Sequence, residues 1–293
     1  FTGTAMWIDP GSNLYVIFLA NRLHPDGVGE VNNLAGRIGT IACGALKPTQ
    51  NAFWTGRLSD QSLPDSGDAR KQVRLGIDVL AANKFNLLQG KRVGLITNHT
   101  GCDRNGVSTA KLLHEAEGVQ LVALFSPEHG IAGALDVNRI GDSTDEALGV
   151  PIYSLYGGSR QPTSEQLAGI DTLVFDIQDA GARFYTYIAT MGLAMEAAAE
   201  SGREFIVLDR PNPIDGVSIE GPLRDTGRES FVAFHPLPVR HGMTVGELAR
   251  MFAAERKLDV KLTVVPLEGW RRTDYLHDTG LAWVNPSPNM RSE

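Results

Sequence analysis

The chain has 293 residues, of which 42% are hydrophobic and 21% charged, an ordinary composition for a soluble globular protein. Its formal net charge of −7 provides no basic field for nucleic acid or for an anionic membrane, so we expect neither as a partner. The longest apolar run near the start, Leu14–Ala20, is far too short to span a bilayer.

The two cysteines, Cys43 and Cys102, fall in different predicted domains and lack metal-ligand spacing. A disulfide between them is conceivable but is not our expectation. The chain begins with Phe1 rather than methionine and shows no signal peptide, so we expect further residues to precede it.

Residues 1–47 are predicted to form a small first unit. Two apolar runs, Ala5–Ile8 and Leu14–Leu19, flank a turn-forming stretch and predict a β-hairpin. A helix-like pattern follows over Val31–Leu46. Because two strands and a helix cannot enclose a core, we expect this unit to be the end of a larger domain. Residues 48–70 mix Pro, Gly, Ser and Asp without periodicity and are predicted to be a linker.

From residue 71 short apolar strands alternate with amphipathic helices. Strands are predicted at Arg92–Thr97, Gln120–Phe125, Ile152–Leu155, Thr172–Ile177, Phe205–Leu208 and Val260–Val265. Helices are predicted over about 108–117 and 185–200, and after capping boxes at 163–166 and 244–247. This order predicts an α/β fold, with a Rossmann-like, mostly parallel sheet covered by helices on both faces. No GxGxxG follows the first of these strands and no GxxxxGK[ST] is present, so nucleotide binding is not predicted.

Polar residues gather where the predicted strands end, which is where ligands bind in an open parallel sheet. They are Asn98 and His99, then Glu128 and His129, then Asp176, Gln178, Asp179, Arg183 and Tyr185, then Asp209, Arg210, Asn212 and Glu220. Arg240 and His241 are predicted to close a further strand, where they could be rim residues. Paired carboxylates for acid and base work, with amides and arginine to hold hydroxyls, are typical of a sugar-cleaving site.

Several of these residues have structural alternatives. Glu128 could cap a helix, and Asp176 could be buried and paired with Arg183. The stretch 209–213 could be only a rigid turn, because its two prolines fix the backbone.

Other chemistries fit less well. His99, His129 and Glu128 could in principle hold zinc, but no HExxH spacing links them, and His129 is expected to position groups or to bond within the core. No GxSxG elbow is present. We therefore expect no metal or cofactor, with metal-assisted hydrolysis as the minor alternative.

From about residue 71 the chain resembles the exo-β-N-acetylmuramidase family, the NamZ type formerly known as DUF1343. The resemblance is carried by VGLITNHTG (93–101), ALFSPEHGIAG (123–133), IYSLYG (152–157), TLVFDIQDAGARFYTYIATM (172–191), VLDRPNPIDGVSIEGP (207–222), VRHGMTVGEL (239–248) and NPSPNM (285–290). It implies a Rossmann-like catalytic domain at 71–240 and the start of a smaller C-terminal domain at 241–293, with the active site between them. Because family members continue beyond this point, we expect the second domain to be truncated here and this fragment to be less than fully active.

The family resemblance also implies an activity, the release of N-acetylmuramic acid from the non-reducing ends of peptidoglycan fragments in cell-wall turnover or recycling. It implies a secreted or periplasmic location. Its catalytic glutamate corresponds to Glu128, and we expect Glu220 as the second carboxylate, with Asp176 or Asp179 in reserve. Arg183, Arg210 or Arg240 is the candidate to hold the lactyl carboxylate of the sugar. The other polar residues at the strand ends are expected to bind substrate.

Residues 1–47 resemble the C-terminal end of a serine β-lactamase-like or penicillin-binding-type domain. The residues that carry this are FTGT (1–4), WIDP (7–10) and LANRLHP (19–25). These 47 residues lack that family's SxxK motif, so no lactamase activity is expected from them. Two non-enzymatic alternatives stay open, a peptidoglycan-binding module that has lost its chemistry and an accessory domain fused to a β-lactamase-like protein.

Overall fold

The computed structural model describes residues 5–9, 14–18, 72–137, 139–288 and 290. The chain divides into two compact units, Phe1–Asp68 and Ala69–Glu293. In the first unit, β1 (Ala5–Asp9) and β2 (Leu14–Phe18) pair antiparallel, which confirms the strand pairing of the predicted hairpin. The helix predicted over Val31–Leu46, the linker at 48–70 and Cys43 lie outside the described residues.

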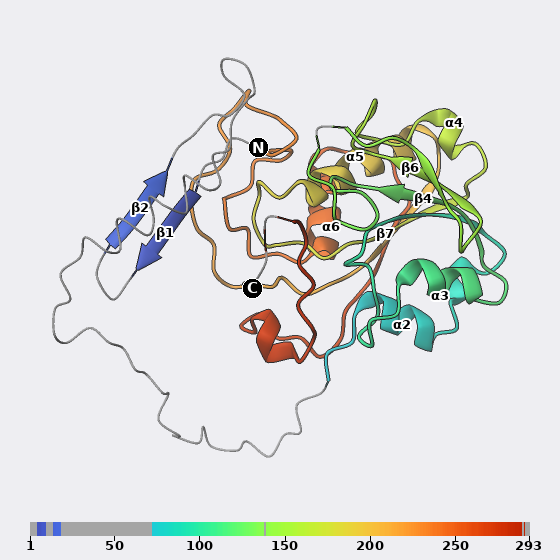
Figure 1. Ribbon diagram of the computed structural model, residues 1–293, viewed down its shortest axis with the longest axis horizontal. Helices are drawn as coiled ribbons and strands as arrows, with labels where there is room; N and C mark the ends of the chain where they lie inside the picture. The colour runs from blue at the N-terminus through green and yellow to red at the C-terminus, as the bar shows by residue number, and fades with distance from the viewer. Residues whose placement is uncertain (1–4, 10–13, 19–71, 138, 289, 291–293) are drawn as a thin grey trace. The chain divides into compact units, whose positions relative to one another are not determined.

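The second unit is built on a seven-stranded sheet of order β5-β6-β4-β3-β7-β8-β9 (Figure 1). All its strand pairs are parallel except that of β5, an antiparallel edge strand that the sequence did not predict. The mostly parallel sheet is therefore confirmed. The strands are β3 (Arg92–Thr97), β4 (Gln120–Ser126), β5 (Ser143–Asp145), β6 (Val150–Ser154), β7 (Thr172–Asp176), β8 (Glu204–Leu208) and β9 (Leu262–Val265).

Helices cover both faces of this sheet, as predicted. On one face α2 (Gly76–Ala82) and α3 (Thr109–Glu115) pack on one hydrophobic cluster, and on the other α5 (Thr186–Glu200) and α6 (Val245–Glu255) pack on a second (Figure 1). Short elements complete the unit: α4 (Ser164–Leu167) and the 3₁₀ turns η2 (Asn86–Leu88) and η3 (Leu276–Thr279). No helix in the described parts of the chain is long and apolar enough to cross a membrane.

The central strands show why the positions of the strands could be predicted from the sequence. All five residues of β7 are buried, with Leu173 and Phe175 in the cluster of α5 and α6, and Val174 in the cluster of α2 and α3. Burying each such side chain stabilises the fold by roughly 1.5–3 kcal/mol, which requires apolar residues on both faces of the strand. A continuous apolar run is the result.

Strand order determines where a ligand can bind. β3 lies between β4 and β7. The chain first runs outward from β3 through β4 to β6, and it then returns to the other side of β3 and continues through β7 and β8 to β9. The connections therefore diverge between β3 and β7, and the loops beyond the carboxyl ends of these two strands form the topological switch point at which such folds bind ligands.

Candidate active site

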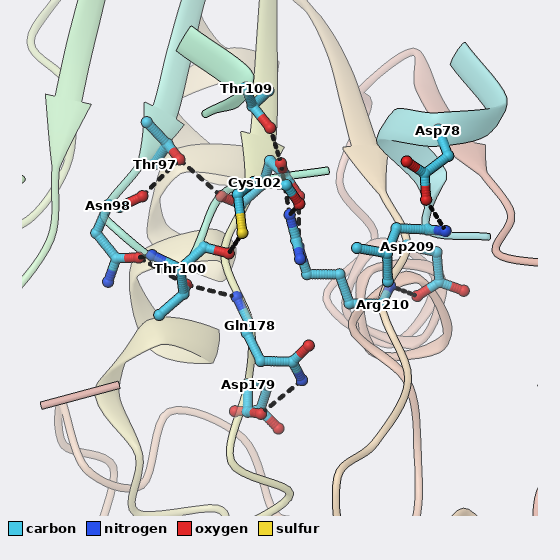
Figure 2. Close-up of polar contacts among 12 residues, drawn as sticks. Asp78, Thr97, Asn98, Thr100, Cys102, Thr109, Gln178, Asp179, Asp209 and Arg210 are labelled. Carbon is cyan, nitrogen blue, oxygen red and sulfur yellow. Dashed lines mark hydrogen bonds and ion pairs between the residues drawn. The ribbon is translucent and has the colours of Figure 1, made fainter. Parts of the chain in front are cut away.

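Hydrogen bonds tie the loops after β3, β7 and β8 together at the switch point (Figure 2). The backbone N–H of Gln178 donates to Thr100 Oγ1 at 3.0 Å, and that hydroxyl donates to Asn98 Oδ1 at 2.7 Å. The Gln178 side-chain amide donates to the carbonyl of Pro211 at 2.9 Å. Three of the segments in which polar residues were predicted to gather therefore meet at one edge of the sheet.

Glu128 joins this group from the loop after β4. It lies in a turn, and its Oε2 accepts a hydrogen bond of 2.6 Å from the hydroxyl of Thr186, in the first turn of α5. The pKa of Tyr156 is raised to about 12, mainly because its hydroxyl is buried. The hydrogen bond to Glu128 and the negative charge of Glu128 raise it further toward that value. Because the carboxylate contacts side-chain hydroxyls and no helix begins at it, the alternative of a helix cap is wrong for Glu128.

Tyr185 connects Glu128 electrostatically to the loop after β7. Burial, together with the charges of Asp179 and Glu128, raises the pKa of Tyr185 to about 12. The ring of Tyr185 meets that of Tyr187 edge-on, with centroids 5.2 Å apart. One tyrosine hydroxyl thus lies within the electrostatic reach of two carboxylates from different strand ends.

Asp179 is paired with His241. Asp179 Oδ2 accepts hydrogen bonds from the backbone N–H of Gly181 at 2.8 Å and from His241 Nε2 at 3.1 Å. The other ring nitrogen of His241 accepts the backbone N–H of Met243 at 3.2 Å. Residue His241 is only 1% exposed, so the interpretation of it as a rim residue is wrong.

Asp176 is enclosed by protein donors. Its oxygens accept from Arg210 Nε at 2.6 Å, from Arg210 Nη2 at 2.9 Å and from the hydroxyl of Thr109 (Figure 2). Arg210 also donates to the carbonyl of Cys102 at 2.7 Å. The expected pairing of Asp176 with Arg183 is therefore wrong. With Asp176 fully buried and Arg210 only 3% exposed, this ion pair attaches β7 to the loop after β8.

Asp209 and Asn212 secure the start of α6. Asp209 accepts from Thr244 Oγ1 at 3.0 Å and from the backbone N–H of Gly246 at 2.8 Å, while Asn212 Nδ2 donates to the carbonyl of Met243 at 3.0 Å. Burial raises the pKa of Asp209 to about 6, in spite of these hydrogen bonds. The stretch 209–213 is therefore more than a rigid turn, because its side chains hold the N-terminus of a helix.

Arg240 is occupied by acidic and carbonyl partners. It contacts Glu220 Oε1 at 3.1 Å and Asp215 Oδ2 at 2.8 Å, and it also donates to the carbonyl of Ile214. Its backbone forms isolated bridges with Ala182 and Glu220, so the expectation that it closes a strand is wrong. The Glu220 side chain, by contrast, is 67% exposed.

The two predicted histidines of the strand ends contact backbone carbonyls. His99 Nε2 lies 2.6 Å from the carbonyl of Asn285, and His129 Nδ1 lies 2.8 Å from that of Leu135. Within the described parts of the chain, no three His, Cys, Asp or Glu side chains are grouped so as to hold a metal ion. Cys102 is a free thiol.

Arg183 differs from the other predicted arginines. Its Nη1 donates to the carbonyls of Pro222, at 2.9 Å, and Leu237, at 2.5 Å. Among the residues that the structure describes, it forms no ion pair with a carboxylate.

Sequence reasoning missed Tyr156 and Thr186. Thr186 lies inside an apolar helix pattern, and Tyr156 follows a predicted strand end within a glycine-rich turn. The only feature in the sequence that could have indicated a role for them is a hydroxyl group close to a strand end or to a helix start. That feature is too common to single out two residues.

The fold and the site define an α/β protein of the Rossmann-like type, with carboxylates, tyrosines and an arginine collected at the switch point of its sheet. The chain belongs to the NamZ family, because residues 93–293 match the family described as "Exo-beta-N-acetylmuramidase NamZ, N-terminal".

Three relatives agree with this membership. Peptidoglycan beta-N-acetylmuramidase NamZ of Bacillus subtilis (strain 168) is 47% identical over 255 residues, covering 84% of this chain and 62% of that protein. A crystal structure of a DUF1343 family protein from Bacteroides fragilis NCTC 9343 is 52% identical with a TM-score of 0.70, covering 74% of this chain and 56% of the other. A second one from that strain is 37% identical with a TM-score of 0.60, covering 70% and 54%. The chain thus spans less than two thirds of each relative.

Proposed function

We propose that the protein is a glycoside hydrolase that releases N-acetylmuramic acid from the non-reducing ends of peptidoglycan fragments. The observation that carries this is the position of Glu128 in the loop after β4, where the Thr186 hydroxyl at the start of α5 holds its carboxylate beside Tyr156. The Bacillus relative named as a peptidoglycan beta-N-acetylmuramidase supports the substrate class.

Glu128 serves as the general acid or base at the anomeric centre. Proton transfer requires a carboxyl group held within hydrogen-bond reach of the glycosidic oxygen, and it contributes about 10²–10⁴-fold to the rate. The bond from Thr186 restricts rotation of the carboxylate, so its geometry is set before the substrate binds.

Of the carboxylates expected to assist Glu128, the geometry favours Asp179. Asp176 is fully buried and its oxygens are taken by Arg210 and Thr109. Glu220 is largely exposed and paired with Arg240, so solvent weakens its influence on a reacting group. Asp179 is buried at the switch point, and one of its oxygens has no hydrogen-bond partner among the described residues.

Arg183 is the arginine suited to the lactyl carboxylate. Arg210 and Arg240 already pair with Asp176 and with Asp215, and recruiting either would break a formed ion pair. Arg183 has no such partner within the described part of the chain, and a carboxylate ligand would supply one.

The protein's setting is proposed from sequence resemblance alone. From the NamZ family we place it outside the cytoplasm, in cell-wall turnover or recycling. From the separate resemblance of residues 1–47 we place them at the end of a β-lactamase-like domain. Cell fractionation and the coding sequence upstream of residue 1 are the checks. A cytoplasmic protein, or an upstream region without an SxxK-bearing domain, contradicts them.

The test replaces Glu128 by Gln in the full-length protein and follows sugar release from a chromogenic N-acetylmuramic acid glycoside and from muropeptide-derived disaccharides. We expect a loss of at least about 100-fold with an unchanged circular dichroism spectrum. Glu115→Gln, on the exposed side of α3, is the matched control. Retained turnover removes Glu128 from the mechanism. Sugar binding without hydrolysis by the wild-type protein favours the binding-module alternative.

A further inference from the structure

Asp179 has one carboxylate oxygen that the protein leaves unused. Its side chain is 4% exposed, and Oδ2 receives the two donors already described, from Gly181 and His241. Oδ1 is buried and makes no hydrogen bond with any residue that the structure describes. A buried carboxylate oxygen without a donor is costly, so this atom marks a place that a ligand donor can complete.

The surroundings hold that carboxylate in a fixed orientation. Gly181 has a φ of +78°, and a Cβ there would lie 2.5 Å from Asn212 Oδ1, so the close approach that brings its N–H to Asp179 requires glycine. Because His241 Nδ1 accepts the N–H of Met243, its Nε2 carries the hydrogen that is donated to Asp179. His241 is buried and has both nitrogens engaged, so it is a positioning residue.

Asp179 belongs to the same site as Glu128. It follows β7 at the switch point, and its charge acts on the Tyr185 hydroxyl together with that of Glu128. Figure 2 shows Asp179 beyond Gln178, on the side of this loop away from Cys102 and from the guanidinium of Arg210, which pairs with Asp176. Its free oxygen is therefore separate from the structural ion pair, and Asp179 and Glu128 share the Tyr185 hydroxyl as an electrostatic neighbour.

We propose that Asp179 Oδ1 accepts a hydrogen bond from the N–H of the sugar's 2-acetamido group, with His241 holding the acid in place. This rests on the proposed function, and it names the group through which the site recognises an amino sugar. A charged acceptor on the amide N–H orients the acetamido group and directs its carbonyl oxygen toward the anomeric carbon.

The arrangement gives the acetamido group the part of nucleophile. As the bond from C1 to the leaving oxygen breaks, Glu128 donates its proton to that oxygen and the acetamido carbonyl oxygen bonds to C1. The resulting oxazolinium ion carries a positive charge next to the N–H, which the Asp179 carboxylate stabilises. Water then attacks C1 and gives a proton to Glu128. The bond between C1 and the acetamido oxygen breaks, which opens the oxazolinium ring and regenerates the acetamide. No second protein nucleophile is needed.

The test compares two chromogenic substrates on each variant of the full-length protein, the N-acetylmuramic acid glycoside and its analogue with a hydroxyl in place of the acetamido group. For Asp179→Asn we expect kcat on the acetamido substrate to fall about 100-fold, as when one preorganised electrostatic partner is removed. The hydroxyl analogue lacks the internal nucleophile and can react only by direct attack of water, so the wild-type rate on it is low. Asp179→Asn should lower that low rate by less than about threefold. Asp171→Asn, in a surface ion pair, is the control and should leave both rates unchanged.

Because each ratio comes from one preparation, partial unfolding lowers both rates alike and cancels. His241→Phe should give the same substrate-dependent loss, and His241→Gln, which keeps an N–H donor, should restore much of it. Equal losses on both substrates for Asp179→Asn overturn the inference while the proposed function stands. A wild-type enzyme that releases no sugar from either substrate overturns both.

Discussion

Replacing Asp176 with asparagine removes the only carboxylate that forms an ion pair with the guanidinium of Arg210 among the described residues. The pair is joined by contacts of 2.6 and 2.9 Å, and both side chains are almost completely buried. Removing one partner of a buried ion pair costs about 3–5 kcal/mol, because the remaining charge is left unpaired in the interior. Since a domain is stable by only about 5–15 kcal/mol, this is a large share of the total.

The assay is urea unfolding of the full-length protein, followed by circular dichroism. With an m-value of about 2 kcal/mol per molar urea, a loss of 4 kcal/mol lowers the midpoint by about 2 M. The matched control is Asp171→Asn, which breaks the pair with Arg92, where the side chains are 38% and 46% exposed. We expect that change to cost about 0–1 kcal/mol.

The comparison also decides the role of Asp176. Adding Arg210→Met to Asp176→Asn should recover part of the lost stability, because the unpaired charge is then removed as well. The structural reasoning is refuted if the midpoints of Asp176→Asn and Asp171→Asn agree. Loss of turnover in folded Asp176→Asn at an unchanged midpoint makes Asp176 the second catalytic carboxylate, the role for which the sequence analysis kept it in reserve.

Two further predictions concern Thr186 and Asp209. Thr186→Val removes the donor to Glu128 and should lower kcat by about tenfold, whereas Thr190→Val, one turn later on α5, should cost about 1 kcal/mol of stability and leave kcat unchanged. Equal kcat losses contradict the positioning role. The folded pKa of Asp209, about 6, lies above the unfolded value of about 3.9, so its contribution to stability is present below about pH 4 and is lost as the pH rises through 6. Asp209→Asn should remove up to about 3 kcal/mol of this decline. The measurement is the free energy of unfolding of both proteins at pH 4, 5 and 6. A variant whose free energy of unfolding falls with pH as steeply as that of the wild type contradicts the prediction.

The sequence was informative where local chemistry dictates structure. The buried strands β3, β4, β7 and β8 are apolar on both faces and stand out as continuous runs, and the capping boxes before α4 and α6 form as expected. α2 was missed because it is only seven residues long and begins after Leu75, which is not a capping residue. β5 was missed because its three residues are largely exposed.

The site was predictable as a place but not as a set of contacts. Polar residues at strand ends must meet, because parallel strands present their carboxyl ends at one edge. The spacing of residues did not indicate that Asp176 pairs with Arg210, 34 residues away, rather than with Arg183. It also did not indicate that Thr186 binds Glu128, 58 residues away.

By itself, then, the sequence determined the α/β architecture, the family and the edge of the sheet where the chemistry lies. Only the tertiary structure decided which charged side chains are paired within the protein and which remain available to a ligand. The physical reason is range: burial and helix capping depend on neighbours a few residues apart, whereas the partner of a carboxylate depends on how the loops of several strands close over the same edge of the sheet.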